Sequence, residues 1–320
     1  MTRVELLLAS LAFAGSALCQ TYPNRSVKII VPWPPGQATD LAARIVADKL
    51  SQSLAQPFVI ENRPGAGGQI GTEQAVKSAP DGYTLLAASS GPISIMPNLQ
   101  KVPYDTLKDL APISLIAATP FALVVHPSFP AANAKEFIAL VRANPDKYTF
   151  SSSGTGATAH LFIELFNSMA QLKVRHVPYK GSQPALTDVI SGQISYTLET
   201  VAATVGHIKS GRLRTFGVST ARRTAALPDI APLAEAAELP GYDTAGWIGY
   251  AAPAGTPREF LVRLAAEIQK ALQAPDLRER YVSLGMDPMW NTPVEMAAYL
   301  KREQDRYATI IRNANIKIEQ

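Results

Sequence analysis

Short, largely apolar segments alternate with amphipathic ones along the first third of the chain. Residues 27–31 and 58–61 are short and rich in β-branched side chains, which predicts buried strands. Between them, residues 41–54 carry apolar side chains at helical spacing, which predicts an amphipathic helix. A further strand is predicted at residues 83–88. This order is typical of a parallel sheet, whose ligands lie beyond the carboxyl ends of the strands.

The alternation resumes after a predicted boundary near Thr119 and Pro120. Over the whole chain, the remaining predicted strands are residues 113–118, 121–126, 148–151, 173–177, 193–198, 214–219 and 245–252. The remaining predicted helices are residues 71–77, 134–143, 157–170, 184–191, 258–273, 276–284 and 293–314. A chain of 320 residues is long enough for two α/β lobes. We expect a discontinuous first domain, residues 20–120 with 246–320, and a second domain at residues 121–245. The two crossings between them predict a hinge beside a closing cleft.

Two turns of one kind follow predicted strands, one in each half of the chain. Residues 32–40 and residues 151–160 are both rich in small side chains, and each turn leads into a predicted helix. The first N–H groups of a helix have no partner within it, and the helix start carries partial positive charge. We therefore expect the two turns to face each other and to hold one organic anion.

Composition and charge indicate a globular protein and exclude other classes. Hydrophobic residues make up 47% of the chain and charged residues only 18%, which argues against disorder. The net charge of +4 is small, and basic residues are scattered. Pairs such as Arg222 with Arg223 have no aromatic residues interleaved with them, so we expect no nucleic-acid partner.

The N-terminus has the pattern of a secretory signal peptide, which we assign to residues 1–19. Arg3 precedes an apolar run at residues 4–18 that is too short to span a membrane. Ala17 and Cys19 supply small residues at the −3 and −1 positions of a cleavage site. We therefore expect a secreted, soluble periplasmic protein.

Cys19 is the one cysteine of the chain. A lipid-modified Cys19 is an alternative, but a lipoprotein signal normally has a small residue where Leu18 stands. An uncleaved N-terminal helix is the other alternative. Cleavage after Cys19 leaves a mature chain without disulfides, thiolate metal sites or a cysteine nucleophile.

An exported hydrolase is the competing class, because serines are plentiful and there are four histidines, His126, His160, His176 and His207. Residues 217–221 come near the G-x-S-x-G nucleophile motif but lack its final glycine. Neither G-x-x-x-x-G-K-[ST] nor a complete G-x-G-x-x-G occurs, which argues against nucleotide chemistry. His160 and Glu164 have the spacing of metal ligands on a helix, but no third ligand is evident. We expect His160 to lie on a helix surface or form a buried hydrogen bond, and we expect no metal, cofactor or catalysis.

Six short segments with distinctive sequences occur along the chain: YPNR at 22–25, ENRPGAGG at 61–68, PDGYT at 80–84, HVPYKG at 176–181, GRLR at 211–214 and APAGTP at 252–257. In this order they resemble the Bug-type periplasmic receptors of tripartite tricarboxylate transporters. The resemblance covers essentially the whole chain after residue 19. It implies an α/β, two-lobed periplasmic-binding-protein fold (Venus flytrap, type II), with mostly parallel sheets flanked by helices and two crossover strands.

The resemblance also implies a function. Such a receptor binds a small organic carboxylate in the interdomain cleft and delivers it to membrane permease subunits, and we expect it to act as a monomer. In the family the first-lobe turn usually reads Pro-Gly-Gly, and here Gln37 replaces the second glycine. Dicarboxylates, tricarboxylates, aromatic acids, amino acids and uncharged compounds therefore all stay open. A sensor that presents its ligand to a signalling partner would use the same cleft and is the alternative function.

The expected ligand-binding residues lie at the two turns and at strand ends: Trp33, Gln37, Ala38, Thr39, Asp40, Ser89, Ser90, Ser153, Thr155, Gly156, Ala157, Thr158, Glu199 and Thr200. Several have a structural alternative. Thr39 and Asp40 are common helix-capping residues, and Trp33 fits core packing. Gly154 and Gly156 could serve backbone geometry alone.

Glu199 and Thr200 follow a predicted strand and are expected at the same opening. A carboxylate that faces an anion is unfavourable, so a structural role is our preferred interpretation of Glu199. The alternative is that Glu199 holds a water or accepts a ligand N–H or hydroxyl.

Overall fold

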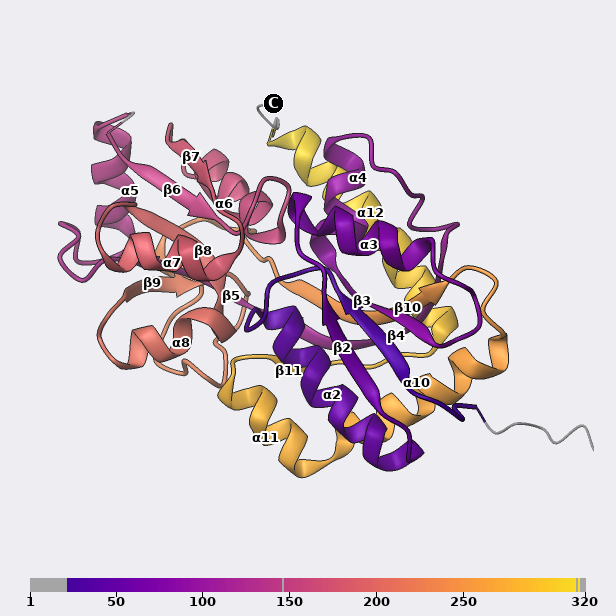
Figure 1. Cartoon of the computed structure of the whole chain (residues 1–320). Helices are drawn as coiled ribbons and strands as arrows, with labels where there is room; N and C mark the ends of the chain where they lie inside the picture. Colours follow the sequence, from indigo (N-terminus) through magenta and orange to yellow (C-terminus); the bar gives the residue numbers. More distant parts are fainter. Residues whose placement is uncertain (1–21, 146, 315, 317–320) are drawn as a thin grey trace, which may run out of the picture.

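The computed structural model describes residues 22–145, 147–314 and 316, which form two lobes that each have a central sheet flanked by helices (Figure 1). The predicted signal peptide lies outside the described residues. The first sheet has the strand order β11-β4-β10-β3-β1-β2. Its strands are β1 (Val27–Val31), β2 (Phe58–Asn62), β3 (Thr84–Ser89), β4 (Leu110–Thr119), β10 (Gly246–Pro253) and β11 (Asp287–Pro288).

The second sheet has the order β7-β6-β8-β5-β9. Its strands are β5 (Phe121–Val125), β6 (Thr149–Ser152), β7 (Arg175–Pro178), β8 (Tyr196–Thr200) and β9 (Arg214–Val218). Most strands of each sheet share one direction, as predicted. The exceptions are β10 and β11 in the first sheet and β5 in the second, which pair antiparallel with their neighbours.

Helices cover both faces of the sheets (Figure 1). They are α2 (Ala38–Leu54), α3 (Gln69–Val76), α4 (Met96–Leu99), α5 (Ala134–Ala143), α6 (Thr158–Met169), α7 (Ser182–Ile190), α8 (Val201–Lys209), α9 (Leu233–Ala236), α10 (Arg258–Gln273), α11 (Pro275–Ser283) and α12 (Pro293–Asn313), with a 3₁₀ turn η1 (Ala66–Gly68) and a π-helical turn η2 (Gly91–Ile95). Among the described residues, no helix is both long and apolar enough to cross a membrane.

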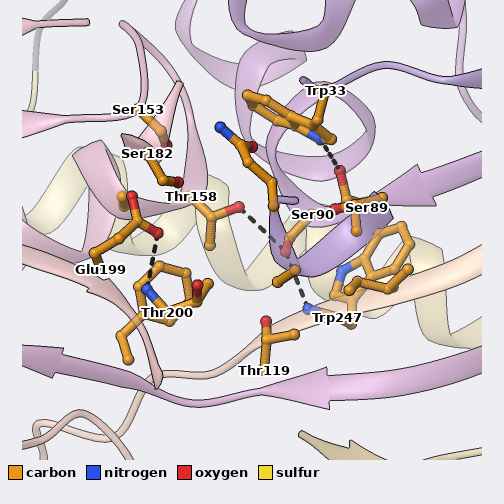
Figure 2. Close-up of a pocket in the computed structure, with 16 residues that line it drawn as sticks. Trp33, Ser89, Ser90, Thr119, Ser153, Thr158, Ser182, Glu199, Thr200 and Trp247 are labelled. Atoms are coloured by element: carbon orange, nitrogen blue, oxygen red, sulfur yellow. Dashed lines mark hydrogen bonds between the residues drawn. The ribbon is translucent and has the colours of Figure 1, made fainter. Parts of the chain in front are cut away.

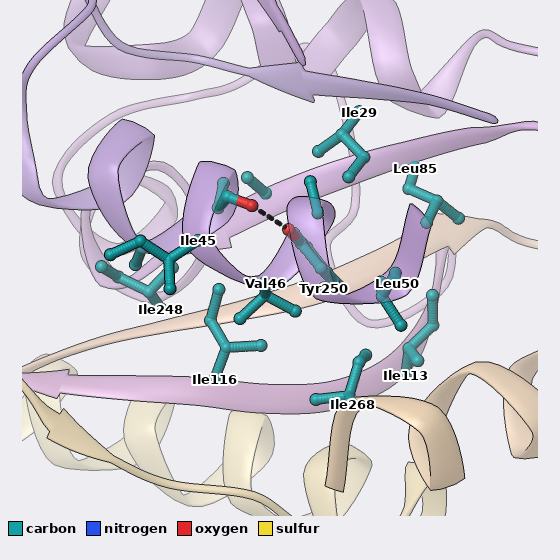
Figure 3. Packing of buried hydrophobic residues seen from close by; sticks show 14 of the residues in the cluster. Ile29, Ile45, Val46, Leu50, Leu85, Ile113, Ile116, Ile248, Tyr250 and Ile268 are labelled. Carbon is teal, nitrogen blue, oxygen red and sulfur yellow. Dashed lines mark hydrogen bonds between the residues drawn. The ribbon is translucent and has the colours of Figure 1, made fainter. Parts of the chain in front are cut away.

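The first lobe has an apolar core on each face of its sheet. Ile29 and Leu85 point toward α2 and α10, where Val46 and Ile268 are buried (Figure 3). Their sequence neighbours belong to a separate core that includes residues of α3 and α12. Because both faces are covered, the strands are apolar at nearly every position. The hydroxyl of Tyr250 donates to the Ala43 carbonyl of α2 over 2.8 Å, which satisfies the one polar group of this buried ring (Figure 3).

The helix α12 contacts both lobes. Met296 and Leu300, in its first half, are buried in the first-lobe core. Tyr307 and Ile311, in its second half, are buried against the aromatic core of the second lobe. The assignment of residues 246–320 to the first domain stays a prediction. The helix α12 belongs to this segment but packs on both lobes.

Two chain crossings join the lobes, as the sequence predicts. β4 of the first sheet passes into β5 of the second through Pro120 alone. The return runs from β9 to β10, and the Thr244 N–H donates to the Ser219 carbonyl within this connection. The two crossings lie side by side, because Ser219 N–H donates to the Phe121 carbonyl.

Element boundaries differ from prediction mainly next to the cleft. Glu199 and Thr200 are the last two residues of β8 and do not follow it, and α8 begins directly after them although no helix was predicted there. The helix α2 begins at Ala38, three residues before its predicted start at residue 41. This earlier start makes Ala38 and Thr39 the first residues of α2.

Candidate ligand-binding site

A cavity of about 40 Å³ lies between the lobes, where the strand ends of both sheets meet (Figure 2). It is lined by Trp33, Gln37, Ala38, Thr39, Ser89, Ser90, Thr119, Trp247 and Ile248 from the first lobe and by Phe121, Ser153, Thr158, Ala159, Ser182, Glu199 and Thr200 from the second. At roughly 10–15 Å³ for each water, this volume holds about three water molecules. In this arrangement of the lobes, the cavity accommodates a small polar group.

Two helix starts border the cavity from opposite sides. Ala38 and Thr39 begin α2, and Thr158 and Ala159 begin α6. Within the described structure, neither helix has a side-chain cap on its first turn. Uncapped N–H groups and the partial positive charge of each helix start favour a bound anion.

Hydroxyl groups connect the two lobes across the cavity. The Thr158 hydroxyl of α6 donates to Ser90 Oγ over 3.3 Å, and Ser90 Oγ also accepts from the backbone N–H of Trp247 over 3.1 Å (Figure 2). Trp33 Nε1 donates to Ser89 Oγ over 2.9 Å, which fixes the indole against the end of β3 (Figure 2). Trp33 therefore packs and lines the cavity at once.

Asp40 does not line the cavity. Its side chain forms hydrogen bonds that hold the first turn in place. Its carboxylate accepts from the Gly36 N–H over 2.9 Å, from Arg44 Nε over 3.0 Å and from Asn62 Nδ2 over 2.8 Å. The bond to Gly36 resembles the reciprocal half of a capping box. Burial raises the pKa of Asp40, but the bonds from Arg44, Asn62 and Gly36 outweigh burial and hold the pKa below its usual value.

The glycines of the second turn use their N–H groups internally. The Gly156 N–H donates to His160 Nδ1 over 3.1 Å, and the Gly154 N–H donates to Ser152 Oγ over 3.3 Å. Gly156 has a φ of 73°, a left-handed conformation that favours glycine. These bonds favour the backbone-geometry interpretation of both glycines. The N–H of Gly156, an expected ligand-binding residue, is already bonded within its own turn.

Four of the expected binding residues do not line the small cavity, namely Asp40, Thr155, Gly156 and Ala157. Ala157 is the N-cap residue of α6. Thr155 lines a larger neighbouring cavity of about 600 Å³, which shares Trp33 and Ser153 with the small one. Of the described residues that line this larger cavity, Lys180 is the one with a charged side chain.

Two glycines lie where the lobes approach each other closely beside these cavities. A Cβ atom at Gly67 would lie 2.8 Å from the Thr155 carbonyl oxygen of the opposite lobe. A Cβ atom at Gly181 would lie 2.8 Å from Gln37 Nε2, again across the cleft. Both glycines have positive φ angles, 62° and 119°. The lobes can reach this separation because neither position has a side chain.

Glu199 is the one ionisable side chain among the residues described as lining the small cavity. Only 2% of the residue is exposed. Glu199 Oε1 accepts from the Thr200 N–H over 2.8 Å, whereas Oε2 has no hydrogen-bond partner among the described residues (Figure 2). Burial raises the pKa of this carboxyl above its ordinary value.

The histidine cluster next to α6 is structural. His160 is buried, stacks on His176 with ring centroids 4.1 Å apart, and lies 3.6 Å from Glu164. The Gly156 bond to His160 confirms the buried hydrogen-bonding role. Among the described residues, no three His, Cys, Asp or Glu side chains are grouped as a metal site requires.

One serine and one histidine have the separation of a nucleophile and its base. Ser152 Oγ lies 2.7 Å from His176 Nε2. Ser152 is fully buried and does not line the cavity, so a substrate has no access to it from there. Burial, together with the neighbouring His160, lowers the pKa of His176 to about 3, which makes it a weak base at neutral pH.

The expected list missed six lining residues: Thr119, Phe121, Ala159, Ser182, Trp247 and Ile248. Thr119 and Phe121 flank Pro120, so the predicted crossing could have indicated them. Ser182 begins α7 directly after Gly181, another helix start at the cleft. The remaining sequence gives no local signal for Trp247, because its position depends on the antiparallel register of β10.

Comparison with known proteins agrees with the resemblance seen in the sequence. The profile described as "Tripartite tricarboxylate transporter family receptor" matches residues 42–316. Among curated relatives, Protein BugT of Bordetella pertussis (strain Tohama I) is 35% identical over 321 residues, covering 99% of this chain and 97% of that protein.

Solved structures share the fold. A protein of R. palustris with adipate superposes with a TM-score of 0.89 at 32% identity, covering 92% of this chain and 99% of that one. MatC from Rhodopseudomonas palustris with bound malate superposes with a TM-score of 0.85 at 29% identity, covering 91% of this chain and all of that one. With its family profile, its relative and its two-lobed fold in agreement, the chain belongs to the tripartite tricarboxylate transporter receptor family.

Proposed function

We propose that this receptor binds a small organic carboxylate between the starts of α2 and α6 and delivers it to the permease subunits of a tripartite transporter. The observation that carries the proposal is the pair of uncapped helix starts on opposite sides of one cavity. No lysine or arginine lines that cavity among the described residues, so an anion there would be met by backbone dipoles, hydroxyls and the side-chain N–H groups of Gln37 and Trp247. The adipate and malate in the two related structures support this class of ligand.

The proposed contacts follow the geometry of the lining residues. The carboxylate oxygens accept hydrogen bonds from the backbone N–H groups of Ala38, Thr39, Thr158 and Ala159. The hydroxyls of Thr39, Ser90, Ser153, Thr158 and Thr200, with Gln37, complete the polar lining, and Trp33, Ser89 and Glu199 form its walls. Buried, charge-assisted hydrogen bonds of this kind are stronger than bonds in water.

We further propose that the protein releases its ligand unchanged, acts as a monomer and resides in the periplasm after cleavage of residues 1–19. A receptor of this family has to pass its ligand on, and the buried Ser152–His176 pair offers no accessible nucleophile. Intact-mass analysis of a periplasmic extract tests the mature N-terminus and the mass of the assembly. A lipid-modified Cys19 would contradict the cleavage site.

Calorimetry on ligand-stripped, refolded protein tests the proposed ligand class. We expect adipate or malate to bind, and adipamide, which carries no charge, to bind much more weakly. Thr158→Val deletes the hydroxyl that borders both lobes and keeps the side-chain shape. A hydrogen bond to a charged group is worth about 1.5–3 kcal/mol, so affinity should fall by about ten- to a hundredfold.

Arg278→Ala, an exposed substitution on α11, is the control and should bind like wild type. If no organic acid binds, or if the amide binds as well as the acid, the proposed function is wrong.

A further inference from the structure

Glu199 has one carboxyl oxygen without a hydrogen-bond partner, in a cavity that otherwise suits an anion. Glu199 Oε1 is occupied by the Thr200 N–H, but Oε2 is buried and unpartnered in the described chain. Ser182 lies beside it without meeting the geometry of a hydrogen bond to Oε2 (Figure 2). A buried polar atom without a partner costs free energy, so a ligand or a proton is expected to satisfy it.

No neighbouring charge compensates Glu199. The adjoining helices carry these titratable groups: Asp40, Arg44, Asp48 and Lys49 on α2, His160 and Glu164 on α6, Asp188 on α7, and His207 and Lys209 on α8. None of them lines the cavity. Burial raises the pKa of Glu199. The Thr200 N–H bond and the nearby hydroxyls of Ser182 and Thr200 lower this pKa by a smaller amount. The facing strand β5 carries no titratable side chain. An ionised Glu199 and a bound carboxylate would therefore repel each other inside a low-dielectric site.

We propose that Glu199 takes up one proton from solvent when a carboxylate binds, and that its Oε2 hydroxyl then donates a hydrogen bond to the ligand. This inference rests on the proposed function and assigns the ligand class more narrowly. A plain carboxylate suits a neutral Glu199, whereas an amino acid would place an ammonium group against an ionised Glu199. Glu199 is thus a specificity-determining residue of the site.

Proton uptake predicts how affinity depends on pH. The pKa of Glu199 is already raised in the free protein, and a bound anion raises it further. Between the two pKa values each ligand molecule brings one proton with it. Within that window affinity falls as pH rises, by up to about tenfold for each pH unit.

Calorimetry with adipate and malate as probes, from about pH 5 to about pH 8, tests this dependence. Measurements in pairs of buffers with different ionisation enthalpies give the number of protons taken up, which should approach one. Glu199→Gln keeps the shape and an N–H donor but cannot ionise, so its affinity should not change with pH. Glu235→Gln removes an exposed carboxylate far from the cavity and should keep the pH dependence of wild type.

The possible outcomes separate this inference from the proposed function. Wild-type binding that is equally tight across the pH range, without proton uptake, contradicts the role of Glu199 and leaves the proposed function intact. If Glu199→Gln loses binding of both probes at every pH, the site requires an ionised carboxylate at this position, and the inference is also wrong. If neither these probes nor any other organic acid binds, the proposed function fails and this inference fails with it.

Discussion

Two buried carboxyl groups, Asp40 and Glu199, show how their surroundings decide the charge of a residue. Burial raises the pKa of both. At Asp40, three donors from Arg44, Asn62 and the Gly36 backbone outweigh burial, and the group stays ionised. At Glu199 burial is the larger effect. The first carboxylate therefore holds the binding turn in shape, and the second can respond to ligand.

Replacing Asp40 by asparagine should destabilise the fold, because it turns one of the two acceptor oxygens into an N–H donor and removes the negative charge that pairs with Arg44. We expect a loss of about 1.5–3 kcal/mol at neutral pH, measured by urea unfolding. The folded-state pKa of Asp40 is lowered from 3.8, so its contribution is present above that value and is lost as pH falls through the folded-state pKa. The difference between wild type and variant should therefore shrink toward acid pH.

Asp48→Asn, on the exposed face of the same helix, is the matched control and should change stability little. Equal stability of wild type and Asp40→Asn at neutral pH would show that the turn does not depend on this carboxylate.

At residue level, the sequence predicted which positions lie at the cavity where a residue follows a strand in a parallel arrangement. Trp33 and Ser89 come at the ends of β1 and β3, and such ends meet at one edge of the sheet. Prediction failed where the outcome depends on tertiary contacts. The Gly156 N–H is taken by His160, a bond that no local pattern announces.

At the scale of elements, strong local signals decided which helices could be predicted. The bounds of α5 and α10 agree with prediction because both have a regular apolar face, and α5 is capped by Asn133. The helix α8 was missed since it is short and contains Gly206 and several β-branched residues, which weaken helix propensity. The π-helical turn η2, which follows Ser90 and contains Pro92, was not predicted.

Gly67, in the 3₁₀ turn η1, should be required for closure of the lobes. Gly67→Ala places a Cβ atom 2.8 Å from the Thr155 carbonyl oxygen across the cleft, so the lobes must separate. The left-handed conformation adds a cost of about 1–2 kcal/mol. We expect weaker carboxylate binding in calorimetry, beyond any loss of stability.

Gly192→Ala is the matched control for backbone strain. Gly192 also has a left-handed φ, 76°, but no atom lies within 4 Å of its added Cβ. It should lose a similar amount of stability without losing affinity. If both variants bind alike, contact between Gly67 and Thr155 does not control closure.

At the scale of the whole molecule, the arrangement places one polar cavity between two separately built cores. The crossings at Pro120 and at Thr244 are adjacent, and α12 packs on both lobes. We therefore expect relative motion of the lobes to occur by bending beside these connections. The sequence predicted two lobes and two crossings from alternating elements, but not the bridging role of α12, which depends on packing of Tyr307 into the second core.

A crystal structure of the chain with adipate tests the central claim most directly. We predict that one adipate carboxylate lies in the small cavity, within hydrogen-bond distance of N–H groups at the start of α2 (Ala38 or Thr39) and at the start of α6 (Thr158 or Ala159). Each carboxylate oxygen should be about 2.7–3.2 Å from its donor nitrogen. A carboxylate found only beside Lys180 in the larger cavity, or one held without either helix start, would contradict the account.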